Sequence, residues 1–166
     1  MSMIANFRML SQAEIESLLA DPESIEELVY VEDGVEDDTV QQLDIDKAWH
    51  GLHYLLCGTV DESALPLGFL LGGGVEVGDV DLGYGPGRIL APDDVHGISN
   101  ALQAVTIADL RARFDASVFT EREIYPAIWS EGDSVLDSFL LPHFEALRDF
   151  VADASRKGRG LLVYLN

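Results

Sequence analysis

Four residues whose side chains bind metals or activate nucleophiles recur in one short stretch of this sequence at steps of three and four residues: Asp46, His50, His53 and Cys57. On a helix this spacing places them along one side, beside a stripe of apolar residues. Metal binding would need three of them on one ion, but the outer two would lie roughly 16 Å apart along the helix axis. The alternatives are a pair, His50 with His53, joined by a carboxylate from another segment, or histidines that only make structural hydrogen bonds. We predict no metal site and no cofactor.

A Cys57–His53 pair fits one helical turn and has the residue types of a cysteine nucleophile with its base. The sequence offers no identifiable group to orient the imidazole and no oxyanion donor. We therefore expect Cys57 to be a small buried apolar residue. No catalytic residue is predicted, and the balance of these observations is against an enzyme.

A glycine-rich stretch at residues 83–87 resembles a phosphate-binding loop but is one residue too short for the dinucleotide pattern and has no Lys-Ser/Thr ending. Acidic neighbours would also repel a phosphate. Arg88 is the only basic residue between Lys47 and Arg111, so its placement is informative. It either holds a carboxylate of its own protein or marks an anion site.

Two aromatic residues near the middle of the C-terminal half, Tyr125 and Trp129, fit either core packing or an aromatic ledge for a ligand. In the second case a cleft would lie between the helix that carries the histidines and the Gly83–Arg88 loop. The candidate ligand-binding residues are His50, His53, Arg88, Tyr125 and Trp129.

The chain has 166 residues, of which 30 are acidic and 10 basic, giving a formal net charge of −20. This charge argues against nucleic acid and against an anionic membrane as partners, because both require a cationic surface. Apolar residues make up 48%, which predicts a folded protein, and a single cysteine excludes an intramolecular disulfide. The first residues lack the pattern of a secretory signal, and no stretch has the roughly 18 apolar residues of a membrane helix. We expect a cytoplasmic protein.

The acidity is concentrated in residues 1–50, which carry 13 acids and two bases. Five of these acids lie in one predicted loop: Glu32, Asp33, Glu36, Asp37 and Asp38. Either the loop serves solubility, or it docks a basic protein, as an inhibitor- or immunity-type protein would. A non-enzymatic binding module for a basic protein partner is the function that the sequence favours. A small-molecule-binding protein or enzyme with the cleft described above is the alternative.

The elements that would position these residues follow from periodicity and capping. Ser11 and Glu14 form a capping box, and Pro22 suits the first position of a second helix. The remaining predicted elements are strands at 4–10 and 160–165, helices at 43–58, 92–105, 107–114 and from 133 onward with a kink or junction at Pro142, and a loop-rich region at 59–88. The fold class is α+β: one domain over 1–166, mostly helical, with a small sheet that includes both terminal strands.

Three motifs resemble the YfbM-like family: LDIDKAWHGLHYLLCG at 43–58, GYGPGRILAPDDV at 83–95 and IYPAIW at 124–129. Their order and spacing agree with that family over nearly the whole chain. Two departures are Cys57, where a threonine is common, and the acidic loop at 32–38. The threonine argues further against a thiol nucleophile. The resemblance implies a bacterial cytoplasmic α+β protein of unknown function, and it supplies no catalytic residues.

Overall fold

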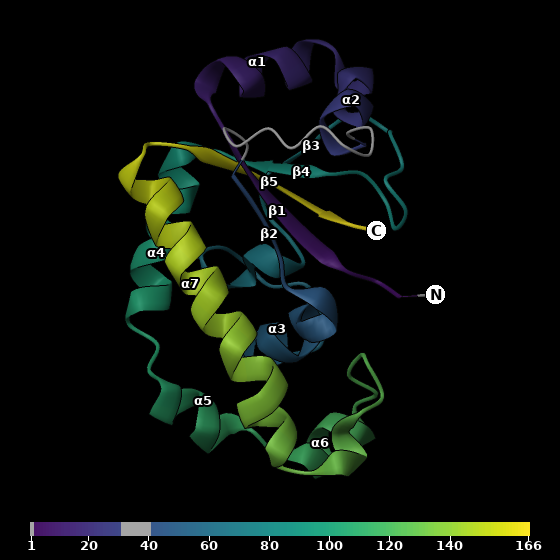
Figure 1. The fold of residues 1–166 in the computed structure, drawn as a ribbon, viewed down its shortest axis with the longest axis vertical. Helices are drawn as coiled ribbons and strands as arrows, with labels where there is room; N and C mark the ends of the chain where they lie inside the picture. Colours follow the sequence, from purple (N-terminus) through teal and green to yellow (C-terminus); the bar gives the residue numbers. More distant parts are fainter. Residues whose placement is uncertain (1, 31–40) are drawn as a thin grey trace.

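The computed structural model describes residues 2–30 and 41–166, and within them the chain forms a five-stranded antiparallel sheet flanked by helices (Figure 1). The strands are β1 (Ala5–Leu10), β2 (Gln42–Asp44), β3 (Val75–Glu76), β4 (Arg88–Leu90) and β5 (Gly160–Leu165), in the spatial order β2-β1-β5-β4-β3. The α-helices are α1 (Gln12–Ala20), α2 (Ile25–Val29), α3 (Trp49–Cys57), α4 (Pro92–Gln103), α5 (Ile107–Arg113), α6 (Ala116–Glu121) and α7 (Leu141–Arg156). The predicted α+β class is confirmed.

The two terminal strands pair along their whole lengths at the centre of the sheet. Phe7 of β1 lies opposite Val163 of β5 in an antiparallel register. Both strands are short apolar runs bounded by a helix cap or a glycine turn, which is the local signal from which they were predicted. The prediction that the N- and C-terminal strands share one sheet is confirmed.

Side-chain alternation on β5 divides the core into two clusters. Leu161 and Val163 pack into the larger cluster with α3, α4 and α7, whereas Leu162 and Tyr164 pack into a smaller one with α1 and α2. Successive residues of a strand point to opposite faces, so a strand covered on both faces reads as a continuous apolar run. Helices α1 and α2 therefore lie on one side of the sheet and the remaining helices on the other (Figure 1).

Two capping boxes begin helices, and the first of them was predicted. Ser11 accepts a hydrogen bond from the Glu14 N–H while the Glu14 carboxylate accepts one from the Ser11 N–H, which fixes the start of α1. Thr106 and Asp109 make the same reciprocal pair at the start of α5. Each cap satisfies helix N–H groups that would otherwise lack a partner and contributes about 1 kcal/mol.

The predicted helix at 43–58 is wrong at its beginning. Residues Gln42–Asp44 form the edge strand β2, where Leu43 pairs with Phe7, and α3 starts only at Trp49. Between them Asp46 adopts a left-handed φ of 50°, and its N–H donates to the Asp44 carboxylate. This local turn, which Asp tolerates, breaks the helix that the apolar spacing suggested. The predicted helix end is confirmed, because Gly58 has a φ of 72° and its N–H donates to the Tyr54 carbonyl.

The interruption expected at Pro142 takes the form of a π-helical segment, Leu136–Leu140, that leads directly into α7. Proline has no N–H to donate, so the first turn of a helix is where it does least harm. The predicted loop-rich region at 59–88 is also confirmed: it holds a 3-10 turn at Leu67–Leu70 and the two-residue strand β3, and β4 begins at Arg88. In the part of the chain that the structure describes, no helix is long and apolar enough to cross a membrane.

Candidate functional site: an aromatic cavity and an acidic face

His50 joins α3 to two other segments. Its Nδ1 accepts a hydrogen bond of 2.9 Å from the Tyr125 N–H, and its Nε2 lies 3.4 Å from the Val60 carbonyl. Because Nδ1 must accept from a backbone N–H, the proton is assigned to Nε2, which donates to Val60. The ring also stacks on Trp49, with centroids 5.2 Å apart. Burial is the main cause that lowers the pKa of His50, so the neutral form is favoured.

His53, one turn later on α3, is fully buried. Its Nε2 donates to the Asp61 carbonyl at 2.7 Å, and burial lowers its pKa as well. Its Nδ1 is buried without a hydrogen-bond partner among the described residues. The two histidines thus hold the chain that follows α3 through successive carbonyls, those of Val60 and Asp61. This is the structural alternative that the sequence left open, and burial, not these bonds, is what lowers the pKa of both rings.

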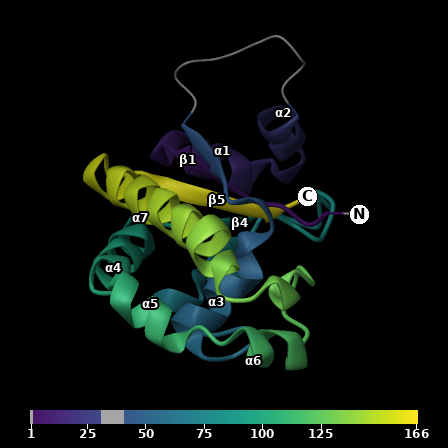
Figure 2. The same cartoon turned by 60° about the horizontal axis from the view of Figure 1, so that its bottom comes forward.

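Tyr125 and Trp129 line a common cavity of about 320 Å³ at the end of α6. Phe119 forms another wall, and its ring meets that of Trp129 edge to face with centroids 4.7 Å apart. The Trp129 indole N–H donates to the Ile124 carbonyl at 2.6 Å. Figure 2 brings α6 and the segment after it to the front of the molecule. We call this space the aromatic cavity.

Glu123, an exposed residue, is the charged member of the set that lines the aromatic cavity. It has a left-handed φ of 54°, because α6 ends in a motif in which the Glu123 N–H donates to Thr120 and the Ile124 N–H donates to Phe119. Glycine is the usual residue at this position, since a side chain there is strained. Sequence reasoning did not select Phe119 or Glu123. A glycine after a helix usually marks where the helix ends, and with glutamate at that position the sequence does not indicate the end of α6.

Arg88 lies elsewhere and is fully engaged. Its two terminal nitrogens donate to four backbone carbonyls, those of Phe69, Leu70, Gly72 and Gly73, at 2.6 to 3.2 Å. Burial lowers the pKa of the guanidinium, although arginine stays charged at any physiological pH. The sequence left open a carboxylate clamp or an anion site. The structure shows a third arrangement, in which Arg88 binds the glycine-rich turn before β3.

The five candidate ligand residues therefore lie in three places. Tyr125 and Trp129 share the aromatic cavity, His50 contacts Tyr125 through the backbone, and His53 and Arg88 make separate structural bonds. Cys57 is half-buried, and burial raises the pKa of its thiol. Across residues 2–30 and 41–166, no group of three or more His, Cys, Asp or Glu side chains is arranged to hold a metal ion. The candidate partner-binding acids Glu32, Asp33, Glu36, Asp37 and Asp38 lie outside the described residues.

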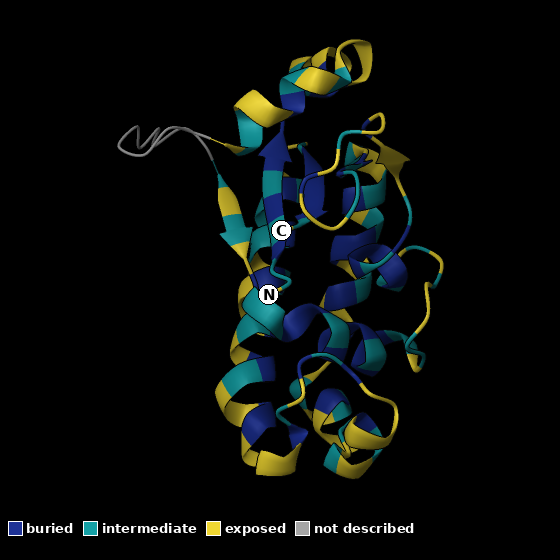
Figure 3. Ribbon diagram, turned by 90° about the vertical axis from the view of Figure 1, so that its right-hand side faces the viewer, coloured by how far each residue is buried: buried dark blue, intermediate teal, exposed yellow. Residues whose placement is uncertain are grey.

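A second feature is the surface formed by α1, α2 and the 75–87 loop, which we call the acidic face. Its carboxylates are exposed: Glu16, Glu23, Glu26, Glu27 and Asp79. The loop packs beside the helices, since the Tyr30 hydroxyl donates to the Leu82 carbonyl at 3.3 Å. Residues 11–30 and 75–87 contain no lysine, arginine or histidine. The outward surface of α1 and α2, at the top of Figure 3, is largely exposed.

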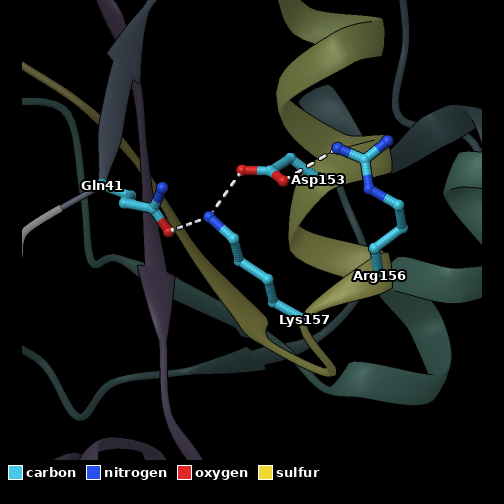
Figure 4. Close-up of polar contacts among 4 residues, drawn as sticks. All are labelled: Gln41, Asp153, Arg156 and Lys157. Carbon is cyan, nitrogen blue, oxygen red and sulfur yellow. Dashed lines mark hydrogen bonds and ion pairs between the residues drawn. The ribbon is translucent and has the colours of Figure 1, made fainter.

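Three basic side chains around this face are bonded within the chain. Arg8 is 13% exposed, donates to the Leu28 carbonyl at 2.8 Å and lies 3.6 Å from the Glu14 carboxylate. At the end of α7, Lys157 and Arg156 both bind the Asp153 carboxylate at 2.9 Å, and Lys157 also reaches Gln41 (Figure 4). The hydrogen bond from Lys157 is the main cause that lowers the pKa of Asp153, and the bond from Arg156 adds to it. Arg8, Arg156 and Lys157 therefore each have a partner within the chain.

Comparison with known proteins identifies the family without an activity. The chain is similar to a protein of unknown function, YfbM from Escherichia coli, whose crystal structure superposes with a TM-score of 0.74 at 22% sequence identity, covering 98% of this chain and 99% of that one. At that identity the likeness shows the fold alone. No curated protein matches the chain. A family model described as a domain of unknown function, DUF1877, matches residues 1–164, which confirms the YfbM-like resemblance, and the chain belongs to that family.

Proposed function

We propose that this chain is a non-enzymatic cytoplasmic binding module whose acidic face docks a basic patch on a protein partner, as an inhibitor- or immunity-type protein does. One observation carries the proposal. The large apolar side chains that are most exposed among the described residues are Leu19, Tyr30, Val75 and Tyr84, with exposed fractions of 47%, 54%, 55% and 39%. All four lie in the same two segments that contain acids and no bases.

Exposed apolar side chains among carboxylates have the composition of a protein interface. Interfaces gain affinity from a few anchors, in which tyrosine is enriched, and surround them with a polar rim. Tyr30 would act as the anchor, with Leu19 adding apolar contact area and Glu23, Glu26 and Glu27 forming the rim. Rim charges mainly accelerate association with a partner of opposite sign, and salt screens their effect. The predicted partner-binding acids at 32–38 follow α2 in the sequence and lie outside the described residues.

The experiment compares two triple variants with the same change in net charge. One removes three carboxylates from the acidic face (E23Q/E26Q/E27Q), and the control removes three exposed carboxylates from the far end of the molecule (E121Q/E131Q/E145Q). Proteins retained by the wild type at low salt are identified, purified and tested for direct binding, because capture alone does not establish a partner.

With the purified basic partner, the face variant should associate about ten-fold more slowly and with a weaker dependence on salt, while the control should resemble the wild type. Y30A should leave association largely unchanged and accelerate dissociation, since an anchor acts after docking. Equal effects of the two triple variants would show a non-specific charge effect. That result, or no bound protein at any salt concentration, would refute the proposal.

A further inference from the structure

The aromatic cavity has the size and the walls of a small-ligand site. Its volume of about 320 Å³ is at the lower end of the range for such sites. Of the apolar residues that line it, Tyr125 is half-buried and Ala127 exposed, whereas Phe119, Ile124 and Trp129 are almost fully buried. It is formed by α6 and the segment that follows, on the other side of the sheet from the acidic face (Figure 1). A ligand here would therefore be bound independently of the proposed protein partner.

The walls are held in place before any ligand arrives. The Trp129 indole N–H donates to Ile124, the Tyr125 N–H donates to His50, and the Tyr125 hydroxyl accepts from the Met3 N–H at 3.0 Å. Trp129 is almost fully buried, whereas Tyr125 is half-buried and is the aromatic residue of the wall that keeps accessible surface. A wall that need not reorganise costs a ligand less free energy on binding.

Glu123 supplies the only charge among the residues that line this cavity. Among the described residues, no basic side chain lies within ion-pair distance of its carboxylate. The neighbouring Arg122 is directed at the ring of Tyr54, with its guanidinium carbon 5.9 Å from the ring centroid. The carboxylate is therefore free to pair with a ligand.

The position of Glu123 is unfavourable for its side chain. A left-handed residue at this helix end favours glycine, yet the chain places a carboxylate there, at the edge of an aromatic cavity. Strained residues of this kind concentrate at functional sites. A free carboxylate beside aromatic rings attracts an organic cation, which gains from the charge and from the electron-rich faces of the rings.

We propose that the aromatic cavity binds a small primary amine with an aryl or branched alkyl body, its ammonium group pairing with Glu123 and its apolar body contacting the half-buried ring of Tyr125. Anions are disfavoured, since both the cavity and the whole molecule are negative. A cavity of this volume suits a compact molecule rather than a protein segment.

The test uses 2-phenylethylamine as the probe, with 2-phenylethanol as its neutral counterpart and 3-phenylpropionate as its anionic one. Binding is followed by the NMR resonance of the Trp129 indole N–H, which lies in the cavity wall. The amine should bind about ten-fold more tightly than the alcohol, and the propionate should not bind. E123Q should abolish the preference for the amine, while E121Q, which changes the net charge equally, should retain it.

Several outcomes would overturn the proposal. One is no change in the Trp129 resonance up to the solubility limit of the amine. Another is equal affinity for amine and alcohol, and a third is an equal loss in E121Q and E123Q, which would indicate a long-range charge effect. Amine binding should be unchanged in E23Q/E26Q/E27Q, so failure at the cavity and failure at the acidic face can be told apart.

Discussion

Removal of the Arg88 guanidinium should strongly destabilise the fold, because it frees four backbone carbonyls at once. R88M keeps most of the aliphatic stem but leaves four carbonyls without their donor, at Phe69, Leu70, Gly72 and Gly73. A hydrogen bond to a charged group contributes about 1.5 to 3 kcal/mol, and the four bonds cannot simply be added because they share one group. Water can reach some of the freed carbonyls, so we expect a loss of about 3 to 5 kcal/mol in the free energy of unfolding.

Urea unfolding followed by tryptophan fluorescence measures this loss. The control is R111M, which removes the same charge from an exposed pair with Asp137 and should cost less than about 1 kcal/mol. R88K restores the charge but not the planar fork of donors, and should recover only part of the loss. If R88M does not fold, R88K still provides the measurement. A loss in R88M no larger than in R111M would show that the four bonds do not hold the 69–73 turn.

Two further predictions concern titration and backbone strain. Burial lowers the folded-state pKa of His50 and His53 below the value of 6.5 for an exposed imidazole, so the unfolded chain binds more protons as the pH falls below 6.5. The free energy of unfolding should therefore decrease from about pH 7 towards pH 5, and the H50Q variant should show a smaller decrease. Urea titrations of the wild type that give the same free energy of unfolding across this pH range would contradict the prediction. E123G should raise the free energy of unfolding by up to about 1 kcal/mol while removing amine selectivity, because glycine relieves the left-handed strain; a lower urea midpoint than the wild type would show that no strain is stored there.

The parts of the fold that were predicted correctly are those encoded within a few residues. The capping box at Ser11 and the apolar runs of β1 and β5 specify their own conformation, and Gly58 specifies a helix end. Strand β2 was missed because its structure depends on a distant partner: Leu43 pairs with Phe7 across the sheet. Its apolar spacing fits a helix equally well, and only the turn at Asp46 decides between them.

The candidate site could be predicted only in part for the same reason. Tyr125 and Trp129 were recognised by residue type, and the structure does place them together. Phe119 and Glu123 were missed because their contribution depends on how α6 ends, which no periodic pattern reveals. Arg88 was recognised as unusual, yet its partners are backbone carbonyls, and backbone groups carry no sequence signature.

The distribution of satisfied polar groups separates structural residues from residues that are free to bind. Some polar side chains bond to the backbone of this chain and so belong to the structural framework: His50, Arg88 and the indole of Trp129. Within residues 2–30 and 41–166, Glu123 and the rim of the acidic face have no ion-pair partner for their carboxylates. Selection for stability alone would favour glycine at 123 and fewer like charges on α2, because strain and mutual repulsion both oppose folding. These carboxylates persist despite strain and repulsion and have no partner within the described chain. An external ligand or protein that binds them would therefore gain the most binding free energy.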